Sequence, residues 1–196
     1  FPRGYHFELV GGFFPPSVGL TGLAGLLDGF GSKMKEEAKR YYGSFVALLQ
    51  RGEMIPNENC YVEISGDVKD KYGIPVLKFH YAHSDHEYAQ VTHAQQSAKA
   101  IVERMGGRIF MGVGNPKWTI DKGGKVIHEV GTCRMGDNSE TSVVNEFGQA
   151  WDVDNLFLMD ASIFTTKAHK NPTLTILALA WRNSDYLVEQ MTQGAF

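Results

Sequence analysis

Hydrophobic and polar positions predict a mixed order of strands and helices in the first part of the chain. Residues 5–10 alternate with the period of two that is typical of a strand. Glycines and a Pro-Pro pair follow, so we expect a loop over residues 11–31. Ser32 stands where an N-cap would stand, before apolar residues with helical spacing over residues 34–48. These residues predict a helix that ends at Gly52.

The next segment predicts a hairpin followed by a second helix. Residues 60–64 and 76–80 both alternate, and a polar turn over residues 66–73 separates them. Ser84 and Glu87 have the spacing of a capping box, in which each side chain accepts a hydrogen bond from the other residue's backbone N–H. The second helix is therefore expected to begin directly after Ser84.

Two further strands are predicted between the second helix and the C-terminal helix. Gly106 and Gly107 are expected to end the second helix, and residues 109–113 predict a strand that stops at an Asn-Pro pair. A loop-rich stretch follows. Residues 156–159 are all apolar, which is typical of a strand buried on both faces.

The composition of the chain argues against several classes of protein. The chain has 196 residues, of which 43% are hydrophobic, so it can form a core. A net charge of −3 argues against a nucleic-acid-binding protein, which usually carries a basic patch. Two cysteines cannot form a disulfide framework. The longest apolar run, residues 174–181, is too short to cross a membrane.

Two segments before the last helix carry candidate chemistry. His128 precedes a turn rich in glycine, and histidine exchanges protons near neutral pH. A single histidine is weak evidence for catalysis, so this residue taken by itself favours the plainer interpretation, a loop histidine hydrogen-bonded to backbone. Asp160 and Ala161 follow the predicted buried strand, where ligands collect in open α/β sheets. Their alternative is a simple turn at the end of a strand, where Asp is common.

The start of the last helix is well specified. Asn is a favoured N-cap and Pro a favoured first helical residue, so Asn171 and Pro172 predict a helix that continues to about Gln190. A helix N-terminus presents unpaired N–H groups and partial positive charge, which favour a neighbouring anion. Asn171 can serve as a cap, as a contact to a ligand, or as both.

Together these segments resemble the C-terminal signature of the glucose–methanol–choline (GMC) oxidoreductases. The resemblance covers about residues 128–188, and residues 1–127 resemble the family only in layout. The stretch over residues 143–149, together with residues 152–153 and 171–175, is most similar to bacterial sugar and gluconate dehydrogenase-like members. The matching motifs, in chain order, are His128-x-x-Gly131-Thr132-x-Arg134-Met135-Gly136, Ser142-Val143-Val144-Asn145, Asn155-Leu156-Phe157, Asp160-Ala161-Ser162 and Asn171-Pro172-Thr173-x-Thr175-Ile176.

The resemblance implies a role for each candidate residue. His128 matches the catalytic base, which takes the hydroxyl proton of the substrate as hydride leaves for flavin N5. Asn171 matches the second catalytic position, which hydrogen-bonds the substrate oxygen. Two pairs match residues that bind flavin adenine dinucleotide (FAD). Asp160 and Ala161 match residues near the ribityl chain and pyrophosphate. Pro172 and Thr173 match backbone that contacts the isoalloxazine ring.

One departure concerns the phosphate-binding fingerprint Gly-x-Gly-x-x-Gly. Gly112 and Gly114 follow a predicted strand, but an Asn-Pro pair comes next and the third glycine is missing. Gly19, Gly22 and Gly25 have the wrong spacing. We therefore expect the adenosine end of FAD to be held by another subunit or by a missing first part of the same polypeptide. A first residue Phe1 likewise predicts a chain that is processed or truncated at its start.

The expected fold class is α/β. Residues 1–125 would form most of an α+β substrate-binding domain, and residues 126–196 would add a strand and the last helix to a Rossmann-like FAD-binding domain. The implied reaction is oxidation of an alcohol group of a sugar or glycoside. The implied partners are a chain carrying the N-terminal FAD-binding motif and an electron acceptor, which is oxygen, a quinone or a cytochrome. A bacterial cytoplasmic or periplasmic location stays open.

Two alternatives belong to other classes. The first is a scaffold subunit that kept the fold without activity, against which the presence of His128 and Asn171 argues. The second is a metal-dependent sugar-binding module that uses the evenly spaced His80, His83 and His86. These histidines run from a strand end into a helix cap and lack a Cys or Glu cluster, so no metal is expected. The roles of two further residues stay undecided. His169 is a candidate to line the site. Arg134 contacts either the substrate or a carboxylate of the protein, and we favour the carboxylate.

Overall fold

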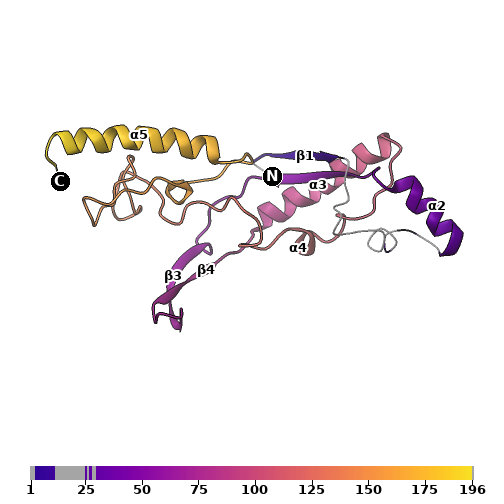
Figure 1. Cartoon of the computed structure of the whole chain (residues 1–196), viewed down its shortest axis with the longest axis horizontal. Helices are drawn as coiled ribbons and strands as arrows, with labels where there is room; N and C mark the ends of the chain where they lie inside the picture. The colour runs from indigo at the N-terminus through magenta and orange to yellow at the C-terminus, as the bar shows by residue number, and fades with distance from the viewer. Residues whose placement is uncertain (1–2, 12–24, 26, 28–29, 196) are drawn as a thin grey trace.

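The computed structural model describes residues 3–11, 25, 27 and 30–195, and most of the loop expected over residues 11–31 lies outside them. Helices and antiparallel strands are mixed along the chain, so the α+β character is confirmed. Figure 1 shows one long helix at the C-terminal end, a second long helix beside a pair of strands, and a separate projecting hairpin. None of the described helices has both the length and the apolar character needed to cross a membrane.

The first sheet pairs two strands that are distant in sequence. β1 (Tyr5–Gly11) is the expected strand, and it pairs antiparallel with β2 (Val46–Gly52) so that His6 lies opposite Arg51. The helix expected over residues 34–48 is therefore wrong in its second half. Side chains alternate between the two faces of a strand, so His6 and Arg51 lie on one face together with Glu8.

The helix that precedes β2 is shorter than expected. α2 (Gly31–Tyr41) ends before Gly43, whose φ of +79° is left-handed and breaks the helix. The N-cap is Phe30, and no side chain caps the helix, so the N-cap expected at Ser32 is also wrong.

The hairpin is confirmed, with longer strands than the alternation predicted. β3 (Tyr61–Lys69) pairs antiparallel with β4 (Pro75–His80). Figure 1 shows the hairpin extending away from the other elements. Its apolar side chains Ile64 and Phe79 are accordingly exposed, at 70% and 66% of their area.

The capping box is confirmed at the start of α3 (Asp85–Arg104). The Glu87 carboxylate accepts hydrogen bonds from the backbone N–H and the hydroxyl of Ser84, at 2.7 and 2.6 Å. The helix ends before Gly106, which has a φ of +69°, as the glycine pair predicted. α3 packs along β2, and Tyr5 of β1 donates a hydrogen bond to Ser97 of the helix at 3.1 Å.

The strand expected over residues 109–113 is wrong. Gly112 has a φ of +85°, which interrupts an extended run, and no strand is assigned there. Asn115 instead caps the short helix α4 (Pro116–Thr119), since its side chain accepts a hydrogen bond from the Lys117 backbone at 3.0 Å.

The C-terminal part is mostly loop up to its final helix. Residues 156–159 form a single antiparallel bridge, between Gln149 and Phe157, and Leu156 is half exposed, so the fully buried strand expected there is not formed. A short 3-10 helix, η1 (Ala161–Ile163), follows. The last helix, α5 (Thr173–Thr192), confirms the predicted C-terminal helix.

Candidate active site

One small core holds the three signature segments together. Val144 and Ile163 are fully buried and Phe164 is nearly so. Val130, two residues after His128, packs against this core from one side, and Ile176, five residues after Asn171, packs from another. The core therefore fixes the backbone near His128, the backbone near Asp160 and the start of α5 relative to one another.

Backbone hydrogen bonds tie the glycine-rich loop after His128 to η1. The N–H groups of Gly131, Cys133 and Met135 donate to the carbonyls of Ala161, Ser162 and Ile163 at 3.2, 2.9 and 2.8 Å. Gly131 has a φ of +88°, and a Cβ added there would lie 3.1 Å from the Phe164 carbonyl oxygen. Glycine is thus required where the loop crosses this backbone.

Asp160 and Ala161 lie directly beside this loop. The Asp160 carboxylate caps η1 by accepting a hydrogen bond from the Ser162 N–H at 2.7 Å, and the residue is exposed. The Ala161 carbonyl accepts the Gly131 N–H. The structure therefore brings these two expected cofactor-binding residues next to the segment that carries His128.

His128 has an unusual backbone conformation. Its φ is +86°, and it is the one non-glycine residue with positive φ in the part of the chain that the structure describes. Such conformations cost about 1–3 kcal/mol and cluster at functional sites. The residue is half-buried, and among the described hydrogen bonds none uses its imidazole, so both ring nitrogens are available to a ligand.

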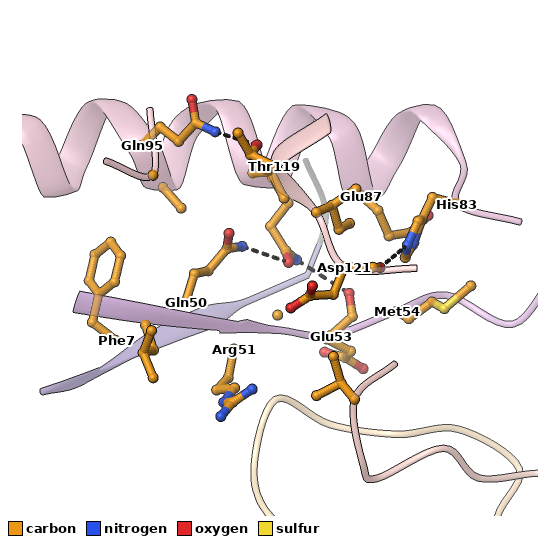
Figure 2. Close-up of a pocket in the computed structure, with 18 of the residues that line it drawn as sticks. Phe7, Gln50, Arg51, Glu53, Met54, His83, Glu87, Gln95, Thr119 and Asp121 are labelled. Atoms are coloured by element: carbon orange, nitrogen blue, oxygen red, sulfur yellow. Dashed lines mark hydrogen bonds between the residues drawn. The ribbon is translucent and has the colours of Figure 1, made fainter. Parts of the chain in front are cut away.

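His128 lines a cavity of about 400 Å³. The walls come from β2, from α3 and from residues 119–128, with Lys167 on the side of the C-terminal segment. Figure 2 shows Gln50 pointing from β2 toward α3, while Arg51 points to the opposite side of the strand. Both residues are among those that line the cavity.

Asn171 does not cap α5, contrary to expectation. The N-cap position falls on Pro172, which has helical φ and ψ, and no side chain accepts a hydrogen bond from the first turn. Asn171 is exposed, and no described hydrogen bond uses its amide. Pro172 is buried and Thr173 is exposed. The first N–H groups of α5 and the Asn171 amide are thus both left for other partners.

A histidine pair connects the start of α5 to the sheet. The rings of His169 and His6 lie 5.2 Å apart, which places the segment just before Asn171 against β1. Burial, followed by the nearby Lys170 and His169, lowers the pKa of His6. On the same face the Arg51 guanidinium donates to the Glu8 carboxylate at 3.0 Å and lowers the pKa of Glu8. Asn171 is not among the residues that line the cavity containing His128, and no described hydrogen bond joins the two residues.

Other histidines and Arg134 have structural partners. His80 Nε2 lies 2.9 Å from the Glu63 carboxylate, whereas His83 Nε2 lies 3.0 Å from the Asp121 carbonyl oxygen, so the two rings are held at different places. In the described ranges, no cluster of three or more His, Cys, Asp or Glu could hold a metal ion. Arg134 donates to the Thr141 carbonyl at 2.7 Å, and none of the described carboxylates forms the ion pair with it that we favoured.

Sequence reasoning missed two cations of the cavity. Arg51 was placed in a helix rather than in β2, and Lys167 carried no motif. The Met54 and Lys167 backbones form an antiparallel bridge, which brings the C-terminal segment against the end of β2. Residues 46–52 do not alternate between apolar and polar side chains, so no local signal in the sequence indicated that Arg51 lies on a strand.

Comparison with known proteins identifies the family. The family model described as GMC oxidoreductase matches residues 56–180. The chain belongs to the GMC oxidoreductases.

Three relatives are similar over most of this chain. The 2-methyl-1,2-propanediol dehydrogenase of Mycolicibacterium austroafricanum is 30% identical over 191 residues, which make up 95% of this chain and 33% of the relative. The fructose dehydrogenase large subunit of Gluconobacter japonicus is 29% identical over 165 residues, 84% of this chain and 29% of the relative. The gluconate 2-dehydrogenase flavoprotein of Pantoea cypripedii is 25% identical over 193 residues, which make up 94% of this chain and 31% of the relative. The chain thus spans about a third of these relatives' length.

Proposed function

We propose that this chain is the catalytic and substrate-binding part of an FAD-dependent enzyme that oxidises an alcohol group of a sugar or glycoside. The observation that carries this proposal is His128, whose unengaged imidazole lines a cavity in a GMC domain and whose backbone has positive φ. Support for a hydroxylated substrate comes from the relatives, which are named as dehydrogenases of a diol, of fructose and of gluconate.

In this proposal the flavin would lie against residues near α5 and η1. The first turn of α5 has no side-chain cap, so its N–H groups can donate to an acceptor that becomes anionic. Thr173, which is exposed, would meet the ring system there together with the backbone of the buried Pro172. Asp160 and Ala161 would lie along the ribityl chain and pyrophosphate. When bound, FAD supplies the hydride acceptor at N5, and the protein supplies proton transfer, orientation and electrostatics.

His128 would act as the general base. A neutral imidazole nitrogen accepts the proton of the substrate hydroxyl, which makes loss of hydride from the carbon easier. The core contact of Val130 and the Gly131–Ala161 hydrogen bond hold the backbone after His128, so the ring is positioned by packed structure rather than by a partner side chain.

Asn171 would donate a hydrogen bond to the substrate oxygen. Its amide carries two N–H donors, and no described contact competes for them. A donor aimed at that oxygen orients the alcohol and stabilises the negative charge that develops as the proton leaves. In this scheme His128 and Asn171 would approach the same hydroxyl from two segments joined through one core.

The FAD-binding part would lie outside this chain. We assign residues 1–125 to the substrate-binding domain and residues 126–196 to a segment that completes the FAD-binding domain. An exposed apolar stripe on α5 supports this, because a contiguous stripe of this kind is typical of a surface that another segment covers. Its members recur with helical spacing: Leu174, Leu177, Trp181, Val188 and Met191.

The test is substrate-dependent flavin reduction by the complete protein. Purified complete polypeptide, or complex, should carry FAD. Under anaerobic conditions a sugar, a glycoside or a small diol should bleach the oxidised flavin band, and the preferred one of these identifies the substrate class. A protein without flavin, or a flavin that none of the three reduces, would refute the proposal.

A further inference from the structure

Two cations line the cavity on the side of the C-terminal segment. Arg51 comes from β2, and Lys167 is held beside the end of that strand by the backbone bridge to Met54. Arg51 uses its Nε to bind Glu8 at 3.0 Å, and its two terminal nitrogens take part in no hydrogen bond or ion pair among the described residues. Over the same ranges the Lys167 ammonium has no carboxylate within 4 Å.

The carboxylates of the cavity wall are engaged elsewhere. Glu53 binds Arg3 at 2.7 Å, and Asp121 binds Lys125 at 2.6 Å. Glu87 is used by the capping box and by the Ile55 N–H. Each of these anions has its own donors, so none of them neutralises Lys167.

The surroundings of Lys167 favour an incoming anion. Burial, followed by repulsion from Arg51, lowers the pKa of Lys167, while attraction to Glu129 opposes this shift. The Glu129 carboxylate itself accepts a hydrogen bond from the Gly124 N–H at 3.1 Å. A half-buried ammonium that no carboxylate compensates is stabilised when an anion binds next to it.

We propose that Lys167 and Arg51 bind a carboxylate of the substrate, so that the alcohol oxidised is a hydroxyl of a sugar acid. This inference rests on the proposed function. Arg offers planar paired donors and Lys a point charge, both of which match a carboxylate. A cavity of about 400 Å³ is large enough for a six-carbon acid. His128 lines the same cavity and would meet a hydroxyl further along the chain of carbons.

The experiment compares a sugar acid with its neutral analogue on the complete flavoprotein. Steady-state kcat/KM is measured for gluconate and for sorbitol with an artificial electron acceptor. The parent should prefer gluconate. In Lys167→Gln the ratio of the two kcat/KM values should fall about ten- to a hundred-fold, the effect of one charge-assisted hydrogen bond. Lys167→Arg keeps the charge and should keep most of the preference.

Two controls make the result decisive. Lys99→Gln removes a lysine that pairs with Glu103 on the exposed side of α3, and it should leave the ratio unchanged. In the parent, added salt should lower kcat/KM for gluconate and not for sorbitol, which tests the charge even where Lys167→Gln fails to fold.

Four results would overturn the proposal. A parent that prefers sorbitol, or an unchanged ratio in Lys167→Gln, leaves the proposed oxidation standing and removes the sugar-acid assignment. Lys167→Gln could instead lose bound flavin while the remaining holoenzyme keeps the parent ratio of the two kcat/KM values. That result would show that the two cations bind the cofactor rather than the substrate. Failure of every alcohol to reduce the flavin would remove the proposed function and this inference with it.

Discussion

Asn171 allows its catalytic and structural roles to be separated by substitution. If it capped α5, its replacement by Ala would cost about 0.5–2 kcal/mol. In the structure the N-cap is Pro172 and the Asn171 amide caps nothing, so the expected change in the free energy of unfolding is below about 0.5 kcal/mol. Asn171→Asp should also keep the melting temperature, because a carboxylate is favourable near a helix N-terminus.

The same substitutions should affect catalysis strongly. Removing one donor to a developing oxyanion typically slows the reaction about a hundred- to a thousand-fold. Asn171→Ala loses the donor, and Asn171→Asp also adds a negative charge where charge develops. Asn171→His can still donate and should retain more activity than Asn171→Asp.

Thermal melting and anaerobic stopped-flow reduction of the flavin, on the complete protein, measure both effects. The expected pattern is three melting temperatures near that of the parent and a rate order of parent, His, then Ala and Asp. Reduction at the parent rate in Asn171→Asp would remove the catalytic role. A loss of 1–2 kcal/mol in Asn171→Ala would show that the residue caps the helix after all.

Two further predictions concern stability. Gly131→Ala should destabilise the complete protein by more than Gly124→Ala. Both substitutions carry the left-handed strain of roughly 1–2 kcal/mol, but the Cβ added at Gly124 has no atom within 4 Å. Equal melting temperatures of the two variants would show that the Phe164 carbonyl does not constrain the loop. Asn183 is fully buried and neither amide atom has a described partner, so Asn183→Leu should raise stability by about 1 kcal/mol. The control Asn145→Leu removes an acceptor used by two backbone N–H groups and should destabilise. Destabilisation by Asn183→Leu, in thermal or urea unfolding, would mean that the amide is satisfied.

Local signals in the sequence predicted the parts of the fold that depend on neighbours in the chain. The Ser84–Glu87 capping box is set by residues three apart, and the hairpin by alternation on both sides of one turn. β2 was missed because its strand conformation depends on pairing with β1, where Glu8 meets Leu49. Apolar residues at helical spacing could not reveal that distant partner.

The residues of the candidate site that belong to sequence motifs were predictable, and the features that depend on distant contacts were not. His128, Asp160 and Asn171 belong to motifs, and the structure places their segments around one core. The positive φ of His128 and the cation Lys167 were not predictable, because both depend on contacts between segments far apart in sequence. The cap expected at Asn171 failed because Pro172 takes the N-cap position, one residue later than composition suggested.

The most direct test of the central claim is the rate of flavin reduction in His128→Ala. In the complete protein, mixed anaerobically with its preferred sugar or sugar acid, the loss of oxidised-flavin absorbance reports hydride transfer. Positioned general bases contribute on the order of a hundred- to ten-thousand-fold, so the variant should bind flavin normally and reduce it at least a hundred-fold more slowly. Reduction at a rate near that of the parent would contradict the assignment of His128 as the base.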